Sequence, residues 1–476
     1  MKRAKLSMLL SIATATVCAV AADDINSSAF ARSMKSEVQS AVKSHPSGLA
    51  QRANQRAIAN ELEASRSRYL PEVSVFGEVG AEIVDNPNSL SANDNDEWKT
   101  SRQIGVSARL TLFDGYERAN ALYRNAARLD GALYSVLATS EAVALNAVEA
   151  YIDVYRHRRL LTIARQNIRR HREILRQIRS RVAGGKSPAS DSFQIEERVY
   201  AAQTVEVEIE KASRDAAAKF RKSVGRSPSG KMSIPRVRHL PRSVASLIDA
   251  SVANSYQLKA LQKSVSESEY AENVGDAAYM PKVHLEGRTS IGEDRGGSSG
   301  EEHDAFVGLK LSWKLYDGGV SYSETNAQAE RTGKAMYQRD VKVREIRETA
   351  ERSWNSYIND GRRRSLLQSQ VNTNRKIVKN YREEYELSKR TLLDVLDAER
   401  ARFNSEFQQI GATAAHQFSA FRMLATQSKL ADYFGMPQDA IVPRADYEDQ
   451  FLNASKRGLV STSGQSIFNI DIAPLK

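Results

Sequence analysis

An internal duplication constrains this chain more than any other feature of its sequence. The run Tyr69-Leu70-Pro71 recurs as Tyr279-Met280-Pro281, 210 residues later, and Phe113-Asp114-Gly115 recurs as Tyr316-Asp317-Gly318, 203 residues later. The second offset continues without a gap, so that Asp191 is matched by Asp394 and Glu196 by Glu399. The chain is therefore a tandem duplication of a unit of about 200 residues.

Four segments between these motifs alternate between apolar and polar residues. They cover residues 72–84, 103–112, 283–291 and 307–315. A period of two predicts strands with one apolar face and one charged face. A sandwich in water would bury the apolar face against a second sheet, whereas a barrel in lipid would turn that face outward. Four strands are too few to close a barrel alone, and the loops 85–99 and 292–304 are long and acidic.

The remaining sequence predicts very long helices. Residues 116–182 and 321–390 contain no proline, so each is expected to form a helix of roughly 65–70 residues, about 100 Å long. Such helices need coiled-coil-like neighbours. Asp114 and Glu117 have the spacing of a capping box. Residues 226–243 are expected to link the halves, and residues after about Pro437 to form a poorly ordered tail.

The first 22 residues predict a secretory signal peptide, because basic residues precede an apolar run that ends in small residues. Cys18 is the single cysteine, and Val17 before it argues against lipid attachment, so the mature chain has no thiol. Loss of Lys2, Arg3 and Lys5 lowers the formal charge from +11 to +8. Export argues against nucleic acid as a partner.

No later apolar stretch approaches the roughly 20 residues of a membrane helix. The chain is then either soluble in the periplasm or outside, or it crosses a membrane as a β-barrel. Catalysis finds no support, because the seven histidines have no metal-ligand spacing. No phosphate-binding glycine loop with lysine and no Gly-x-Ser-x-Gly elbow occurs. We therefore expect no enzyme, no cofactor and no metal site.

The order of these elements resembles the TolC family of outer-membrane efflux and type I secretion channel proteins. Each repeat runs helix, Tyr-Leu/Met-Pro, strand, acidic loop, strand, Phe/Tyr-Asp-Gly and very long helix; LYDGG at 315–319 and LLDVLDAER at 392–400 are close to family signatures. The resemblance implies a mainly α subunit with a transmembrane β-barrel. Three chains with four strands each would form a 12-stranded barrel, continued by a long α-helical periplasmic barrel.

The resemblance also implies functional residues near the second-repeat motif. Asp394 and Asp397 match an acidic ring at the periplasmic constriction, and Tyr385, Arg390 and Asp191 match the links that hold the gate closed. Ser388 stands where the family usually has glycine, which leaves the turn geometry open.

Simpler interpretations remain for each of these residues. Asp394 lies three residues after a possible Thr391 cap and is then a first-turn helix acid. Asp191 is likewise a helix N-terminal acid, and Tyr385 and Arg390 lie on an ordinary helix surface. Asp397 is matched by Gln194 in the first repeat, so a trimer would carry this acid three times and the first-position acid six times.

The predicted function is a trimeric, passive exit duct of a tripartite efflux pump or type I secretion system in the cell outer membrane, extending into the periplasm. Its partners would be further copies of itself, a periplasmic adaptor (membrane fusion) protein at the helix-hairpin tips near residues 183–190 and 388–393, and an inner-membrane RND or ABC transporter. The alternative is an exported periplasmic coiled-coil structural or adaptor protein without a pore. The expected domains are the signal peptide 1–22, a first repeat 23–230, a second repeat 231–436 and a C-terminal tail 437–476. The cargo stays open.

Overall fold

The computed structural model describes residues 33–84, 98–296 and 299–456. The predicted signal peptide with Cys18 and most of the first acidic loop lie outside the described residues. Two compact units are formed, and each draws on both sequence repeats. Unit 1 contains the described residues of Met1–Gly48 with Ser140–Ser251 and Thr349–Met436, and unit 2 contains Leu49–Thr139, Val252–Glu348 and the described residues from Pro437 onward.

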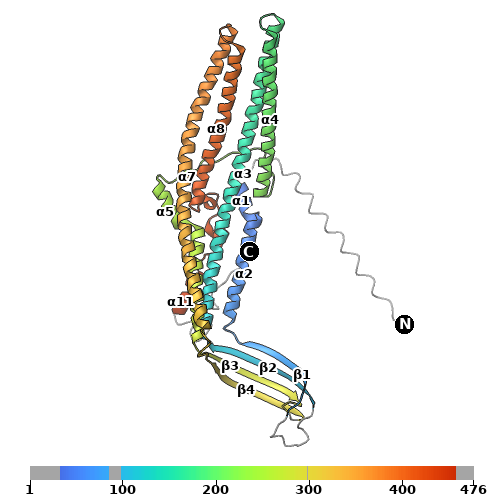
Figure 1. Cartoon of the computed structure of the whole chain (residues 1–476), viewed down its shortest axis with the longest axis vertical. Helices are drawn as coiled ribbons and strands as arrows, with labels where there is room; N and C mark the ends of the chain where they lie inside the picture. Colours follow the sequence, from blue (N-terminus) through green and yellow to red (C-terminus); the bar gives the residue numbers. More distant parts are fainter. Residues whose placement is uncertain (1–32, 85–97, 297–298, 457–476) are drawn as a thin grey trace, which may run out of the picture. The chain divides into compact units, whose positions relative to one another are not determined.

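The helices reproduce the duplication almost residue for residue (Figure 1). In the first repeat they are α1 (Met34–Ser44), α2 (Pro46–Ser67), α3 (Glu117–Ala183) and α4 (Ala189–Val224). In the second they are α5 (Val244–Asn254), α6 (Tyr256–Asp276), α7 (Val320–Glu386) and α8 (Leu392–Thr426). Both α3 and α7 have 67 residues, which confirms the two predicted long helices. A short 3-10 turn, η2 (Ala277–Tyr279), follows α6.

The start of α3 differs from the predicted capping box. The Asp114 carboxylate accepts hydrogen bonds from the Arg118 backbone N–H at 3.2 Å and from its Nε at 2.7 Å. Glu117 does not reach back to close the box, because its carboxylate pairs with Lys282 at 2.6 Å. Asp114 therefore caps the first turn without the reciprocal bond.

One antiparallel sheet joins the two repeats in the order β1-β2-β3-β4. Its strands are β1 (Glu72–Glu82), β2 (Lys99–Phe113), β3 (Lys282–Glu293) and β4 (Glu301–Ser312). The second loop is shorter than predicted, because pairing of Glu293 with Glu301 extends the hairpin. The fourth strand begins earlier than predicted, at Glu301, and also ends earlier, at Ser312, so Trp313 and Leu315 lie outside it. Within the described residues, the outer edges of β1 and β4 pair with no other strand.

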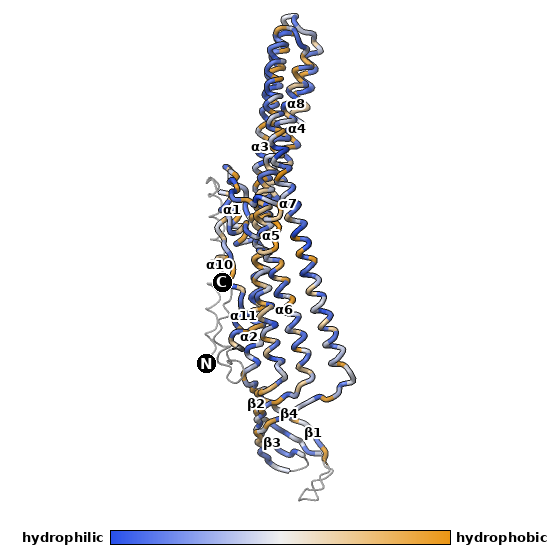
Figure 2. The backbone as a smooth tube through the Cα atoms, turned by 90° about the vertical axis from the view of Figure 1, so that its left-hand side faces the viewer, coloured by the Kyte–Doolittle hydropathy of each residue, from blue (hydrophilic) through white to orange (hydrophobic). Residues whose placement is uncertain are grey.

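The four strands contain both hydrophilic and hydrophobic residues (Figure 2), and the two faces of the sheet differ as predicted. On the apolar face Val75 is 72% exposed, Val307 81% and Leu309 68%. The other face carries cross-strand ion pairs, such as Arg109 with Glu286 at 3.0 Å. No second sheet covers the apolar face in the described chain, so the sandwich alternative is excluded for the single chain.

Helix α3 contains the apolar stretch that the sequence analysis overlooked. One window of α3 is apolar enough to span a membrane by length and composition, but 56% of that window is buried inside the chain. Burial of this kind is typical of a core helix. Residues such as Leu122, Leu133 and Tyr151 are fully buried.

Residues after Pro437 are folded, so the predicted poorly ordered tail is wrong as far as Lys456. They form α10 (Gln438–Ile441) and α11 (Tyr447–Lys456). Phe451 is fully buried. The buried Asp130 carboxylate on α3 accepts hydrogen bonds from the backbone N–H groups of Tyr447 at 3.0 Å and Glu448 at 3.1 Å. The Asp130 carboxylate thus supplies acceptors for N–H groups in the first turn of α11, which explains why this helix packs against α3.

The linker 226–243 contains no helix or strand, and α3 holds it in unit 1. The Tyr151 hydroxyl donates to the Ser233 carbonyl at 3.1 Å and accepts from the Ser233 N–H at the same distance. Arg226 pairs with the buried Glu37 at 2.7 Å. These bonds give the linker's backbone fixed partners without regular structure.

Candidate functional site

The two helix-hairpin turns of unit 1 have the same backbone geometry. In the first, the Lys186 N–H donates to the Arg181 carbonyl at 2.8 Å, and in the second the Lys389 N–H donates to the Glu384 carbonyl at 2.8 Å. This six-residue closure is a Schellman motif, which needs a left-handed residue. Gly185 has φ 71° and Ser388 has φ 58°. Ser388 therefore adopts the glycine conformation, at a cost of about 1 kcal/mol.

Asp394 is the first-turn acid of α8 that the simpler interpretation predicted, three residues after the Thr391 cap. Its N–H donates to Thr391 Oγ1 at 3.3 Å, and its carboxylate accepts from the Thr391 N–H at 3.2 Å, which completes a capping box. Hydrogen bonds from the Thr391 side chain and backbone lower the pKa of Asp394. The carboxylate is thus kept ionised at the end of the hairpin.

The other two acids at the turns have different surroundings. Asp397 lies beyond the cap; its side chain is 46% exposed and approaches Arg400 at 3.2 Å. Asp191 lies in the first turn of α4, where Pro188 at the N-cap offers no side-chain acceptor. Asp397 is therefore a half-exposed acid without a capping role.

The predicted gate residues contact other partners within one chain. Tyr385 packs against a buried apolar cluster of α3, α4 and α8 (Ile174, Ile178, Ile195, Leu392 and Leu396). The Arg181 guanidinium lies over its ring at 4.9 Å. Arg390 pairs with Glu384 at 2.8 Å and lies over the ring of Tyr381 at 4.1 Å. In the described part of the single chain, Tyr385, Arg390 and Asp191 are not bonded to one another.

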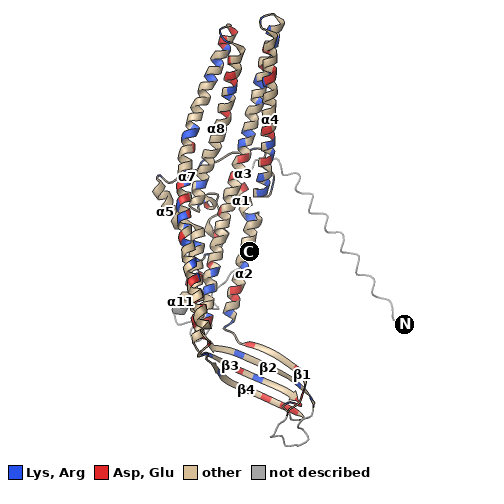
Figure 3. Cartoon of the chain, viewed as in Figure 1, with Lys and Arg blue, Asp and Glu red and all other residues tan. Residues whose placement is uncertain are grey.

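Charged residues of both signs lie along α3, α7 and α8 (Figure 3). A buried cluster of such residues near the α7–α8 turn was not predicted from the sequence. Glu399 on α8 is fully buried and lies 3.3 Å from Arg170 of α3. Arg382 of α7 donates to the same carboxylate. Burial and the neighbouring Arg402 lower the pKa of Arg170. This cluster joins α3 to the α7–α8 hairpin.

A second carboxylate, Glu406, extends the cluster along α8. Arg375 pairs with it at 3.0 Å and Arg402 at 3.4 Å, and its side chain is 7% exposed. The four guanidiniums therefore share two buried carboxylates, so each carboxylate has more than one cation near it.

The duplication contains a signal that points to this cluster. Glu196 and Arg179 are the first-repeat counterparts of Glu399 and Arg382, and they form the same ion pair at 3.4 Å, where Glu196 is 33% exposed. Arg170, however, is matched by Thr373. Both repeats therefore contain the ion pair between the two helices of a hairpin. Only in the second repeat is its carboxylate, Glu399, buried against Arg170.

In the part of the chain that the structure describes, no group of three or more His, Cys, Asp or Glu side chains is placed to hold a metal ion.

Comparisons with known proteins match most of the chain. A family model described as outer membrane efflux protein matches residues 38–226 and 247–423. The outer membrane efflux protein BepC of Brucella suis is 21% identical over 405 residues, which are 83% of this chain and 86% of BepC. The alkaline protease secretion protein AprF of Pseudomonas aeruginosa is 23% identical over 383 residues, 78% of this chain and 76% of AprF.

The fold has matches among solved structures. The outer membrane protein VceC of Vibrio cholerae superposes with a TM-score of 0.69 at 15% identity, over 84% of this chain and 96% of that chain. The arrangement of four strands and long helical hairpins is therefore an established one.

Proposed function

The chain belongs to the outer membrane efflux protein family, and from this premise we propose that three copies form the passive exit duct of a tripartite efflux pump or a type I secretion system. As a member of the family it lies in the outer membrane and extends into the periplasm. One observation carries the trimer proposal: a single chain leaves unpaired the surfaces that a ring of copies would cover.

The sheet is the first such surface. Its apolar face is exposed, and β1 and β4 end the sheet without a neighbour in the described chain. Unpaired edges and exposed valines are unfavourable in water, whereas a closed barrel in lipid satisfies both. Pairing of β4 with β1 of the next copy would give twelve strands from three chains.

The second surface is a stripe on α4. Phe193 is 71% exposed, Tyr200 62% and Val207 66%, and they recur every seven residues as in a coiled-coil seam. Their counterparts on α8 are Leu396, which is 1% exposed, and Phe403, which is 9% exposed. The α8 stripe is buried because it packs against α3.

The duplication then indicates the partner of the α4 stripe. Helix α7 is the counterpart of α3. Leu366 of α7 is 73% exposed, whereas Ile163, the residue of α3 at the matching position, is partly buried. We infer that α4 of one copy packs on α7 of the next, as α8 packs on α3 within a copy. A head-to-tail contact of this kind generates a ring when the rotation closes.

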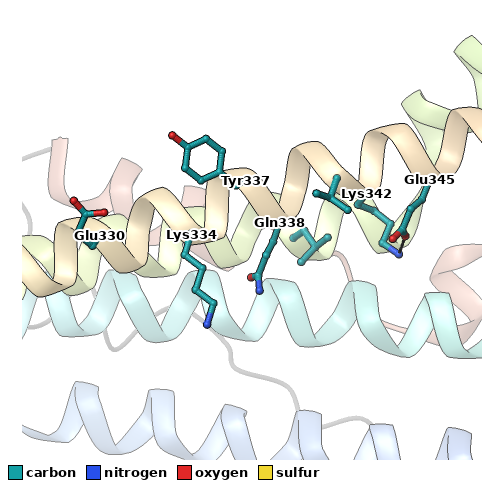
Figure 4. A pocket seen from close by; sticks show the side chains of 8 residues that line it. Glu330, Lys334, Tyr337, Gln338, Lys342 and Glu345 are labelled. Atoms are coloured by element: carbon teal, nitrogen blue, oxygen red, sulfur yellow. Dashed lines mark hydrogen bonds and ion pairs between the residues drawn. The ribbon is translucent and has the colours of Figure 1, made fainter.

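A hollow on unit 2 gives α7 a second exposed apolar surface. It has a volume of about 530 Å³ and is lined by residues that include Leu261, Tyr337 and Val341. Tyr337 is 74% exposed and projects from the opposite side of α7 to Lys334 and Gln338 (Figure 4). Its counterpart Tyr134 on α3 is partly buried. An apolar surface exposed on one repeat alone fits a contact with another copy.

For the assembled ring we also propose roles for the two acids of α8 and for the gate residues. Asp394 and Asp397 would line a cation-selective constriction, since repeated carboxylates around an axis favour cations. Tyr385, Arg390 and Asp191 would link neighbouring hairpins and hold the end closed. The single-chain geometry supports the ring through the ionised Asp394 and the half-exposed Asp397.

The partners follow from the same premise. A passive duct needs an energy source, so we propose a periplasmic adaptor at the turns 184–188 and 387–391 and an inner-membrane RND or ABC transporter. One relative is named for efflux and another for alkaline protease secretion. The proposal therefore includes both small molecules and a secreted protein as cargo.

Planar-bilayer recording tests the duct and its constriction together. We expect heat-modifiable trimers in the outer-membrane fraction and discrete conductance steps. The double variant Asp394→Asn/Asp397→Asn should lose cation selectivity and bind a trivalent cation at least about tenfold more weakly. The control Asp215→Asn removes an exposed acid from α4, with a side chain that is 71% exposed, and should change neither property.

Two results would count against the proposal. A soluble monomer without conductance removes the duct, and unchanged selectivity in the double variant removes the acidic ring. The gate is tested separately: Tyr385→Phe with Arg390→Gln should raise single-channel conductance, and an unchanged conductance removes these residues from it.

A further inference from the structure

A groove in unit 1 lies between the end of α3 and the α7–α8 hairpin and is not part of the acidic site. It has a volume of about 580 Å³. Four apolar side chains line it: Ile174, Ile178, Leu392 and Val395. Each is at most 5% exposed, so they give the groove a fixed apolar wall. A volume of this size matches the roughly 300–1,000 Å³ of sites that hold drug-sized molecules.

The charged lining of the groove is mostly basic. Arg176, Arg181 and Arg382 line it together with one acid, Glu386. Arg176 pairs with Glu173 outside the lining, and Arg382 pairs with the buried Glu399. Arg181 has no carboxylate partner among the ion pairs of the described residues; its guanidinium lies over the ring of Tyr385.

Two guanidinium N–H groups at the groove lack acceptors. The Nε atoms of Arg181 and Arg382 are buried and have no hydrogen-bond partner in the described chain. A buried donor without an acceptor is unfavourable by about 1–3 kcal/mol. The Nε atoms themselves are enclosed, so an anion in the groove would instead accept from the terminal N–H groups of the two guanidiniums, in the planar geometry that they favour.

We propose that this groove binds an amphipathic organic anion, with its apolar body against Ile174, Ile178 and Leu392 and its carboxylate or sulfonate on Arg181 and Arg382. The ring of Tyr385 lies under the Arg181 guanidinium and so holds this cation in place at the groove. The site uses one chain only and therefore does not depend on the proposed duct.

The duplication predicts one site per chain. Arg181 is matched by Glu384 in the second repeat, and Tyr385 is matched by Val182 in the first. The counterpart groove, between α7 and the α3–α4 hairpin, would therefore lose both its free cation and its aromatic face. It would offer an acid where the proposed site offers a guanidinium.

A pair of probes with the same aromatic body separates charge recognition from apolar partition. The full chain in lipid nanodiscs is titrated with 1-anilinonaphthalene-8-sulfonate and with uncharged N-phenyl-1-naphthylamine, and the fluorescence of protein-free nanodiscs is subtracted. The sulfonate should bind once per chain and at least about tenfold more tightly than the uncharged probe, since one charge-assisted contact accounts for that factor.

Variants assign the binding to the groove. Arg181→Met should weaken the sulfonate at least about tenfold, and Arg181→Lys should recover part of the affinity, because it restores the charge without the planar guanidinium. Arg214→Met is the matched control, because it removes the same charge from an exposed side chain of α4 that pairs with Glu210; its affinity should equal that of the wild type.

The proposal is overturned if Arg181→Met and wild type bind the sulfonate equally, or if both probes bind equally well. Thermal unfolding of each variant identifies one that has lost its fold. If Arg181→Met has lost its fold, two other measurements test the proposal. One compares Arg181→Lys with Arg214→Met, and the other compares the two probes on the wild type. Conductance plays no part in these measurements, so failure here leaves the duct proposal standing.

Discussion

The buried cluster around Glu399 gives the sharpest prediction, because the duplication supplies its own control. The change Glu399→Gln keeps the size of the side chain and removes its charge. Glu399 is fully buried and lies near Arg170 at 3.3 Å and Arg402 at 4.0 Å. The change Glu196→Gln removes the counterpart charge, whose carboxylate is 33% exposed and 3.4 Å from Arg179.

The two substitutions should differ several-fold in their effect on stability. Removing one partner of a buried ion pair costs about 3–5 kcal/mol, because the remaining charge stays buried. Glutamine keeps one acceptor oxygen, so we expect about 3 kcal/mol for Glu399→Gln. An exposed pair contributes about 0–1 kcal/mol, which sets the expectation for Glu196→Gln.

Thermal unfolding followed by circular dichroism measures the difference. A change of 1 kcal/mol shifts the melting temperature of a domain of 150–250 residues by about 2–4 °C. Glu399→Gln should therefore lower it by about 6–12 °C, and Glu196→Gln by about 4 °C or less. Both variants and the wild type are measured in the same detergent and at the same protein concentration.

A double variant tests the cause. Arg170→Met in the Glu399→Gln background should be less destabilising than in the wild type, because the guanidinium is then already uncompensated. Equal shifts for Glu399→Gln and Glu196→Gln would refute the assignment of buried charge. Strict additivity of Arg170→Met and Glu399→Gln would refute their coupling.

Three further predictions concern the turns and a second buried acid. Ser388→Gly should raise the free energy of unfolding by about 1 kcal/mol and Gly185→Ala should lower it by a similar amount, since both positions have positive φ. Chemical denaturation measures both changes. A destabilising Ser388→Gly or a stabilising Gly185→Ala would contradict the turn geometry. Thr391→Ala should cost about 1 kcal/mol through the lost cap of α8, and no change would show that the capping box is dispensable. Burial raises the pKa of Glu141 to about 7 from 4.5, so the folded state binds the proton more tightly and loses stability as the pH rises between these values. The melting temperature of Glu141→Gln minus that of wild type should become more positive from pH 5 to pH 8, and a constant difference would contradict the raised pKa.

The site could be located from the sequence only in part. The motif LLDVLDAER and the Thr391 cap placed Asp394 at a helix start, because capping depends on residues three apart in the chain. The partners of Tyr385 and Arg390 did not follow from the motif. Arg181 reaches Tyr385 only because α3 packs against the hairpin, and Arg390 contacts Glu384 and Tyr381 only because the turn folds it back onto α7. The roles assigned to the ring and the gate stay predictions for the assembled protein.

The sequence by itself determined the two repeats, the lengths of the long helices and the faces of the strands. These properties are local: periodicity, proline and turn residues act within a few positions of the chain. Only the tertiary structure decided that Glu399 is buried while Glu196 is partly exposed, and that Asp130 fixes α11 where a loose tail was expected. It also decided that each compact unit combines both repeats. Burial depends on which helices meet in space, and two copies of one sequence pattern meet different neighbours.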